Sequence, residues 1–135
     1  DLGPASGYST AILATLAAHV TGVEPDADLA ETARATLARL GHDNVTIVAG
    51  PLGSGHAAGA PYDVILFEGA IELLPDVIAD QLADGGRIVA VVGTNGLAGK
   101  ATIFTRSGRT VSGRPAFNTH VRALPEFVRP KAFVF

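Results

Sequence analysis

The sequence predicts an α/β fold with a doubly wound, mostly parallel sheet. Short β-branched runs alternate with stretches of helical spacing, a glycine-rich turn stands at the start, and an acidic residue ends the next predicted strand. Such alternation produces parallel strands joined by right-handed crossovers, with a ligand site at the carboxyl ends of the strands. Because 135 residues with 47% hydrophobic content suffice for one buried core, we expect residues 1–135 to form a single domain.

The opening residues 1–8 predict a turn that connects a strand to a helix. A glycine-rich turn of this kind follows a buried strand, so we expect the upstream segment and most of the first strand to be missing from this chain. The apolar residues Ile12, Leu16 and Val20 recur every four positions and predict a helix that includes residues 10–17.

The following elements continue the alternation. Buried strands are expected at 21–24, 45–49, 62–67 and 87–92, and helical spacing is present at 29–40 and 71–82. Gly41 stops the first of these helices, and Pro75 lies near the start of the second. Residues 51–61 contain too much glycine for a firm helix.

The tail of the chain predicts a different, antiparallel arrangement. Strands are expected at 101–106, 110–111 and 119–124, and residues 107–109 predict a hairpin turn between the first two. The sheet should therefore be parallel in its first part and antiparallel in its C-terminal part.

Composition excludes several kinds of site. Cysteine is absent, so the chain cannot form a disulfide framework or a cysteine-based zinc site, and the four histidines lack a ligand spacing. We expect no metal. The chain contains neither a membrane-spanning run nor a signal segment, and we expect a cytoplasmic, monomeric protein that does not contact membranes. Neither Ser9 nor Ser54 lies in a nucleophile-elbow sequence, which argues against a hydrolase.

Charge is divided unevenly along the chain. Twelve of the 13 acidic residues precede Arg87, and eight of the ten basic residues lie from Arg87 onward. The arginines of the basic half are spread out without interleaved aromatic residues, so nucleic acid is not the expected partner. This half forms either a solvated face or a surface that attracts a substrate with additional carboxylates.

Two features at predicted strand ends indicate a nucleotide-like ligand. The small residues of the turn 3–7 let the backbone approach a ligand closely, and Asp1 could accept hydrogen bonds from a ligand ammonium or from the turn. Glu24 lies where nucleotide-binding α/β folds place an acid that accepts ribose hydroxyls; the alternative is a solvated carboxylate at a helix start. Tyr8 replaces the third glycine of the NAD fingerprint, so the turn suits S-adenosylmethionine better.

The motifs resemble those of the protein-L-isoaspartate O-methyltransferases over nearly the whole chain. The first nine residues resemble the family motif E/D-x-G-x-G-S-G-Y. Further segments follow the family pattern in order, at 23–26 (V-E-x-D), 40–45 (L-G-x-x-N-V), 49–52 (G-D-G), 62–65 (Y-D-x-I), 74–75 (x-I-P), 82–87 (L-x-x-G-G-R) and 130–135 (a closing strand).

This resemblance implies a Rossmann-like methyltransferase fold and S-adenosylmethionine as cofactor, with S-adenosylhomocysteine as product. The implied reaction moves the methyl group to the free carboxylate of L-isoaspartyl or D-aspartyl residues in damaged proteins, which is protein repair. The implied cofactor-binding residues are Asp1, Gly3, Pro4, Ala5, Ser6, Gly7, Tyr8, Glu24, Pro25, Pro51 and Leu52. Glu68 and Gly69 should border the methyl-transfer site. The family's substrate-binding hydroxyl lies before the first motif, so we assign no catalytic residue.

Two residues depart from the family pattern within the implied cofactor site. Ala5 replaces the middle glycine of the first motif, and Pro51 replaces the acid that would accept the adenine amino group. Proline also lacks the backbone N–H of that position. These departures keep two alternatives open: a non-catalytic methyltransferase-like interaction module, and a methyltransferase that acts on a small molecule or RNA.

Overall fold

The computed structural model describes residues 1–93 and 97–130, and the predicted closing strand lies, from Lys131 onward, outside them. The helices are α1 (Tyr8–Ala14), α2 (Ala27–Arg39) and α3 (Asp76–Ala79), with short 3-10 turns η1 (Leu52–Ser54), η2 (Ala57–Gly59) and η3 (Pro125–Phe127). The strands are β1 (Val20–Glu24), β2 (Val45–Ala49), β3 (Tyr62–Ile71), β4 (Leu82–Val92), β5 (Gly99–Ser107) and β6 (Thr110–Thr119).

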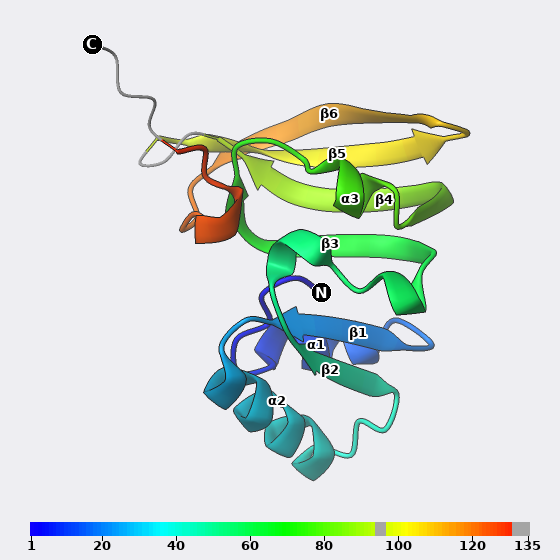
Figure 1. Cartoon of the computed structure of the whole chain (residues 1–135), viewed down its shortest axis with the longest axis vertical. Coiled ribbons are helices and arrows are strands. Elements are labelled where there is room, and N and C mark those ends of the chain that lie inside the picture. The colour runs from blue at the N-terminus through cyan, green and yellow to red at the C-terminus, as the bar shows by residue number, and fades with distance from the viewer. Residues whose placement is uncertain (94–96, 131–135) are drawn as a thin grey trace.

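The strands form two groups (Figure 1). Leu2 joins them. β1 pairs with β2 in parallel, and β3 pairs with β4 in parallel, while β5 lies between β4 and β6 and is antiparallel to both. Leu2 bridges in parallel to Val23 of β1 and to Phe67 of β3. The parallel order is therefore β2, β1, Leu2, β3, β4, which confirms the predicted doubly wound α/β fold with an antiparallel C-terminal part.

Residues of β1 and β3 and the segment before β1 line a cleft. Its volume is about 680 Å³, and Leu16, Thr21, Tyr62 and Val64 are among its lining residues. Val64 is 57% exposed and Leu16 is 79% exposed, although both are large apolar side chains. Among the described residues, only Leu2 forms bridges to both strands.

The helix α2 confirms its sequence prediction, with a start two residues earlier. The Asp26 carboxylate accepts hydrogen bonds from the backbone N–H groups of Asp28 and Leu29, which begins the helix. Gly41 ends it with a φ of 78°, a left-handed conformation that favours glycine. The buried face, which packs on β1 and β2, consists of Ala30, Ala33 and Leu37.

The helix α1 is shorter than its apolar spacing predicted, and the predicted buried face is wrong. Ile12 and Leu16 are exposed, Val20 belongs to β1, and the buried helical residues are Thr10 and Ala14. The Asn44 amide donates hydrogen bonds to the carbonyl oxygens of Ala14 and Ala17, which satisfies the end of the helix.

Three further boundaries differ from the predictions. The helical segment expected at 71–82 contains only the one-turn α3, because its first residue continues β3 and its last begins β4. The strand expected at 119–124 is wrong: β6 already ends at Thr119, and Ala123 contributes a single bridge to Ala70. The prediction that β2 is a buried strand is also wrong, because β2 lies at the sheet edge and only its Ile47 is buried.

The main core lies beneath the turn and joins the tail to the sheet. Leu2, Val23, Phe67 and Phe127 belong to one buried cluster. The rings of Phe67 and Phe127 meet edge to face with centroids 5.1 Å apart, a favourable aromatic geometry. The tail is thus packed against the carboxyl end of β3, near the expected ligand site.

Candidate functional site

The glycine-rich turn follows Leu2 and bends back through left-handed conformations. The φ values are 89° at Gly3, 50° at Ala5 and 93° at Gly7, and the Gly7 N–H donates to the Pro4 carbonyl over 2.9 Å. A Cβ at Gly7 would come within 3.3 Å of the Ala33 Cβ. Glycine at position 7 therefore permits both the turn and the close packing of α2. Ala5 adopts a conformation that costs a non-glycine residue about 1 kcal/mol.

Glu24 ends β1 with its side chain against this turn. It is only 5% exposed. Its Oε2 accepts a hydrogen bond of 2.9 Å from the Ala5 N–H, and its Oε1 accepts one of 3.1 Å from the Asp26 N–H. Glu24 is therefore not a solvated carboxylate. A buried anion at the carboxyl end of a parallel strand is suitable for binding hydroxyl donors of a ligand.

Asp1 lies between the turn and α1, and one of its carboxylate oxygens has no partner. Oδ2 accepts hydrogen bonds from the Ser9 hydroxyl at 3.1 Å and the Thr10 hydroxyl at 2.6 Å. Oδ1 is buried without a hydrogen-bond partner among the described residues. A buried acceptor of this kind is costly unless a donor reaches it. It therefore fits the ammonium group of a ligand.

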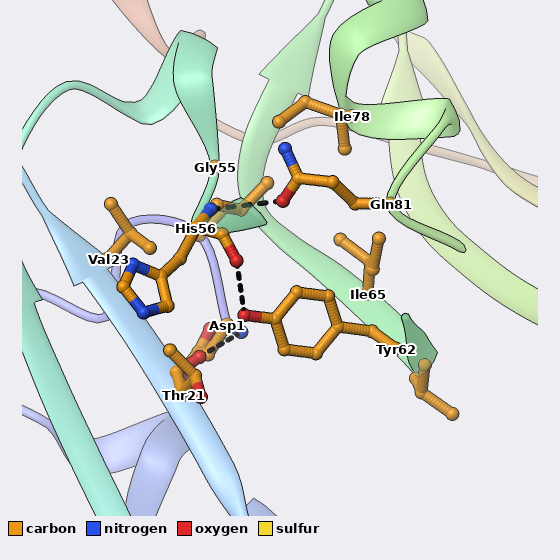
Figure 2. A pocket seen from close by; sticks show the side chains of 11 residues that line it. Asp1, Thr21, Val23, Gly55, His56, Tyr62, Ile65, Ile78 and Gln81 are labelled. Atoms are coloured by element: carbon orange, nitrogen blue, oxygen red, sulfur yellow. Dashed lines mark hydrogen bonds between the residues drawn. The ribbon is translucent and has the colours of Figure 1, made fainter. Parts of the chain in front are cut away.

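The backbone nitrogen of Asp1 borders a small adjoining pocket (Figure 2) and donates to the Thr21 carbonyl over 2.9 Å. Burial raises the pKa of Tyr62, whose hydroxyl donates to the His56 carbonyl. The pocket holds only about 30 Å³ and includes neither Glu24 nor Leu52. We therefore place the candidate site at the turn rather than in this pocket.

The segment after β2 lies beside Glu24. The Gly50 N–H donates to the Glu24 carbonyl over 3.0 Å, and Pro51 and Leu52 follow. Pro51 is exposed, whereas the Leu52 side chain is buried. The backbone N–H groups of Leu52 and Gly53 both donate to the carboxylate of Glu126, from the tail.

Sequence reasoning missed Glu126. The contact spans more than 70 positions of the chain, which no local motif reveals. The available signal was compositional, since Glu126 is the single acidic residue from Arg87 onward.

The two predicted substrate-side residues lie within the last four residues of β3, because this strand continues to Ile71 instead of ending at residue 67 as predicted. Their surroundings differ. Glu68 is exposed, and its Cβ is 3.8 Å from the Cβ that a side chain at Gly3 would have. Gly69 is buried under the tail, where an added Cβ would come within 2.7 Å of both the Arg122 carbonyl and the Leu124 side chain. Glu68 thus borders the turn, and Gly69 allows the tail to pack closely.

The other predicted residues lie around the rim of the turn. Pro4 is buried, whereas Ser6, Tyr8 and Pro25 are exposed. Over residues 1–93 and 97–130, no group of three metal-binding side chains is present. No helix in the described part of the chain is long and apolar enough to cross a membrane.

Comparisons with a family profile and with individual relatives identify the same family. A sequence profile of protein-L-isoaspartate(D-aspartate) O-methyltransferase (PCMT) matches residues 1–120. Over 109 residues, the chain is 40% identical to the protein-L-isoaspartate O-methyltransferase of Methanoculleus marisnigri, covering 81% of this chain and 50% of that protein. The chain spans about half the length of the curated relatives it matches.

Solved structures show the same fold. A protein-L-isoaspartate O-methyltransferase superposes with a TM-score of 0.85 at 25% identity, covering 91% of this chain and 40% of the other. A second structure, from Plasmodium falciparum and in complex with S-adenosyl-L-homocysteine, superposes with a TM-score of 0.74 at 21% identity, covering 92% and 63%.

Proposed function

Since this chain belongs to the protein-L-isoaspartate(D-aspartate) O-methyltransferase family, we propose that its protein transfers the methyl group of S-adenosylmethionine to the free carboxylate of L-isoaspartyl or D-aspartyl residues in damaged proteins. The observation that carries this proposal is the pairing of the buried Glu24 carboxylate with the left-handed turn that follows Leu2. The substrate is a protein or peptide, and the product of the cofactor is S-adenosylhomocysteine.

The residues present fit this cofactor at three points. The unpartnered Oδ1 of Asp1 is an acceptor for the ammonium group of the methionine part. Gly3 and Gly7 have no side chains, so the cofactor can lie close to the backbone of the turn. Glu24 offers a buried carboxylate, and each of its oxygens retains a further lone pair for ribose hydroxyls.

The remaining residues of the proposed site surround these three. Pro4, Ala5, Ser6 and Tyr8 form the rest of the turn and the start of α1. Pro25, Pro51 and Leu52 follow the carboxyl ends of β1 and β2, next to the expected place of the adenine. The Leu52 side chain, which is 2% exposed, provides an apolar surface next to the expected place of the adenine.

The reaction requires the protein mainly to position the cofactor and the accepting carboxylate. When bound, S-adenosylmethionine supplies an electrophilic methyl group on a sulfonium cation. The accepting carboxylate is ionised at neutral pH, since an ordinary side-chain carboxyl has a pKa of about 4. The chain therefore has to orient both partners and exclude water. By position at the end of β3, Glu68 and Gly69 lie on the substrate side, and we assign no catalytic residue.

The site also contains two features that favour a second candidate, a non-catalytic module of the same fold. Pro51 provides neither a carboxylate nor an N–H, and Ala5 holds a strained conformation in the turn. A protein that has lost cofactor binding would tolerate both. The two candidates differ in a measurable way, because only the enzyme binds S-adenosylhomocysteine.

Calorimetric titration of the full-length protein with S-adenosylhomocysteine tests the proposal. We expect micromolar binding, and at least a ~30-fold loss in Glu24→Gln, because the amide cannot accept at both positions. Asp28→Asn is the matched control, since Asp28 is an exposed acid in the first turn of α2. Binding that survives in Glu24→Gln would remove Glu24 from the site. A folded protein that binds no cofactor would favour the non-catalytic module.

A further inference from the structure

The carboxylate of Glu126 holds the chain segment that follows β2. Its Oε1 accepts a hydrogen bond of 3.0 Å from the Leu52 N–H, and its Oε2 accepts one of 2.9 Å from the Gly53 N–H. Hydrogen bonds to an ionised acceptor are stronger than those between neutral groups. Glu126, from the tail, is thus hydrogen-bonded to the two residues that follow Pro51.

The position of Glu126 is fixed by the core beneath it. The neighbouring Phe127 is 7% exposed and packs edge to face on Phe67. The Leu124 N–H donates to the Ala70 carbonyl, and the Ala70 N–H donates to the Arg122 carbonyl. These hydrogen bonds join the residues that precede Glu126 to the end of β3. Together with the packing of Phe127, they fix the position of the Glu126 carboxylate.

That place coincides with the base end of the proposed cofactor site. If the ribose lies on Glu24, the base extends away from the glycine-rich turn. It then reaches the segment that begins at Gly50, whose N–H donates to the Glu24 carbonyl. The position that would supply an acid there is Pro51, which has no acceptor in its side chain. Glu126 brings a carboxylate to the next two residues instead.

We propose that Glu126 takes over the role of the missing acid and accepts a hydrogen bond from the 6-amino group of the cofactor's adenine. This inference rests on the proposed function and names a residue that determines its cofactor specificity. A carboxylate has about four lone-pair sites, and the Leu52 and Gly53 amides occupy two of them. A 6-oxo purine would place a second acceptor against the carboxylate, and the two would repel each other.

The test compares the binding of S-adenosylhomocysteine and of S-inosylhomocysteine, in which a 6-oxo group replaces the 6-amino group, to the full-length protein. Glu126 is exposed in the free protein, and a bound base would cover its carboxylate. The wild-type protein should bind the adenine compound at least ~10-fold more tightly, because the 6-oxo group would place a second acceptor against that carboxylate. In Glu126→Gln the ratio should fall to ~3-fold or less, because the amide can donate to a 6-oxo group.

Glu72→Gln is the matched control. The Glu72 carboxylate also accepts a hydrogen bond from a backbone N–H of the tail, that of Arg129 at 3.0 Å. Within the described part of the chain, no hydrogen bond joins it to the segment after β2. This variant loosens the tail to a similar degree and should leave the ratio of the two affinities unchanged. A purely structural role of Glu126 would change both affinities equally and leave the ratio as in the wild type.

Pro51→Asp provides a measurement that does not depend on Glu126 variants being folded. If Glu126 already supplies the acceptor, a new acid at position 51 should raise the ratio by less than ~3-fold; if the acceptor is missing, the ratio should rise by ~10-fold or more. A large rise, or a Glu126→Gln ratio equal to that of the wild type, overturns the inference while the proposed function stands. A wild-type protein that binds neither compound overturns both.

Discussion

The backbone N–H of Ala5 lies 2.9 Å from Oε2 of Glu24, so the strained residue of the turn is hydrogen-bonded to the buried acid of the next strand. Ala5 holds a φ of 50°, and the bond to Glu24 compensates part of the cost of that conformation. The turn and the acid therefore form one structural unit. Changes at either residue should alter the other.

Ala5→Gly should stabilise the protein. Glycine adopts the left-handed conformation without the steric cost of a Cβ, which outweighs its greater freedom in the unfolded chain. We expect a gain of about 0.5–1 kcal/mol in the free energy of unfolding, measured by urea denaturation. Ala35→Gly, at an exposed position inside α2, should instead lose about 1 kcal/mol. Equal losses in both variants would contradict the left-handed strain at Ala5.

Gly7→Ala should destabilise the protein by about 2 kcal/mol or more, because a left-handed backbone and a crowded site act together. The added Cβ would lie 3.3 Å from the Ala33 Cβ and 3.4 Å from the Leu37 side chain. Gly108→Ala separates the two causes, since Gly108 has a φ of 59° with no atom within 4 Å of an added Cβ. It should lose only about 1 kcal/mol. Thermal unfolding of both variants checks the difference.

Phe127→Ala should cost about 3–5 kcal/mol, the usual loss for a buried aromatic ring. The ring is 7% exposed and packs on Phe67, and its removal should free the tail from the end of β3. Phe117→Ala is the contrasting variant, because Phe117 lies on β6 and is 66% exposed. It should change stability by less than about 0.5 kcal/mol. A similar loss in both variants would contradict the role of Phe127 in anchoring the tail.

The parts of the fold that local chemistry determines could be predicted from the sequence. Gly41 was expected to stop the helix that begins near residue 29, and its left-handed conformation at the end of α2 confirms this. Gly3 and Gly7 were expected to permit a tight turn, and both have positive φ values. The alternation of strands and helices predicted parallel pairing, which the pairs β1–β2 and β3–β4 confirm.

Features that depend on distant contacts could not be predicted. The buried face of α1 is set by its packing and by Asn44, a residue 30 positions beyond Ala14. The tail after Thr119 gains its place from Phe127 and Glu126 rather than from strand pairing. The conformation of Ala5 was equally hidden, because an alanine is compatible with ordinary φ values and only the turn around it requires a positive one.

The double pairing of Leu2 makes this residue the mechanical coupling between the two halves of the protein. Its N–H donates to the Leu66 carbonyl and its carbonyl accepts from the Glu68 N–H, while the flanking backbone groups of Asp1 and Gly3 bond to Val23. The residues that lead into the glycine-rich turn are therefore held from both sides of the sheet. A change in the pairing of either β1 or β3 would shift the turn itself, and with it the groups proposed to bind the cofactor.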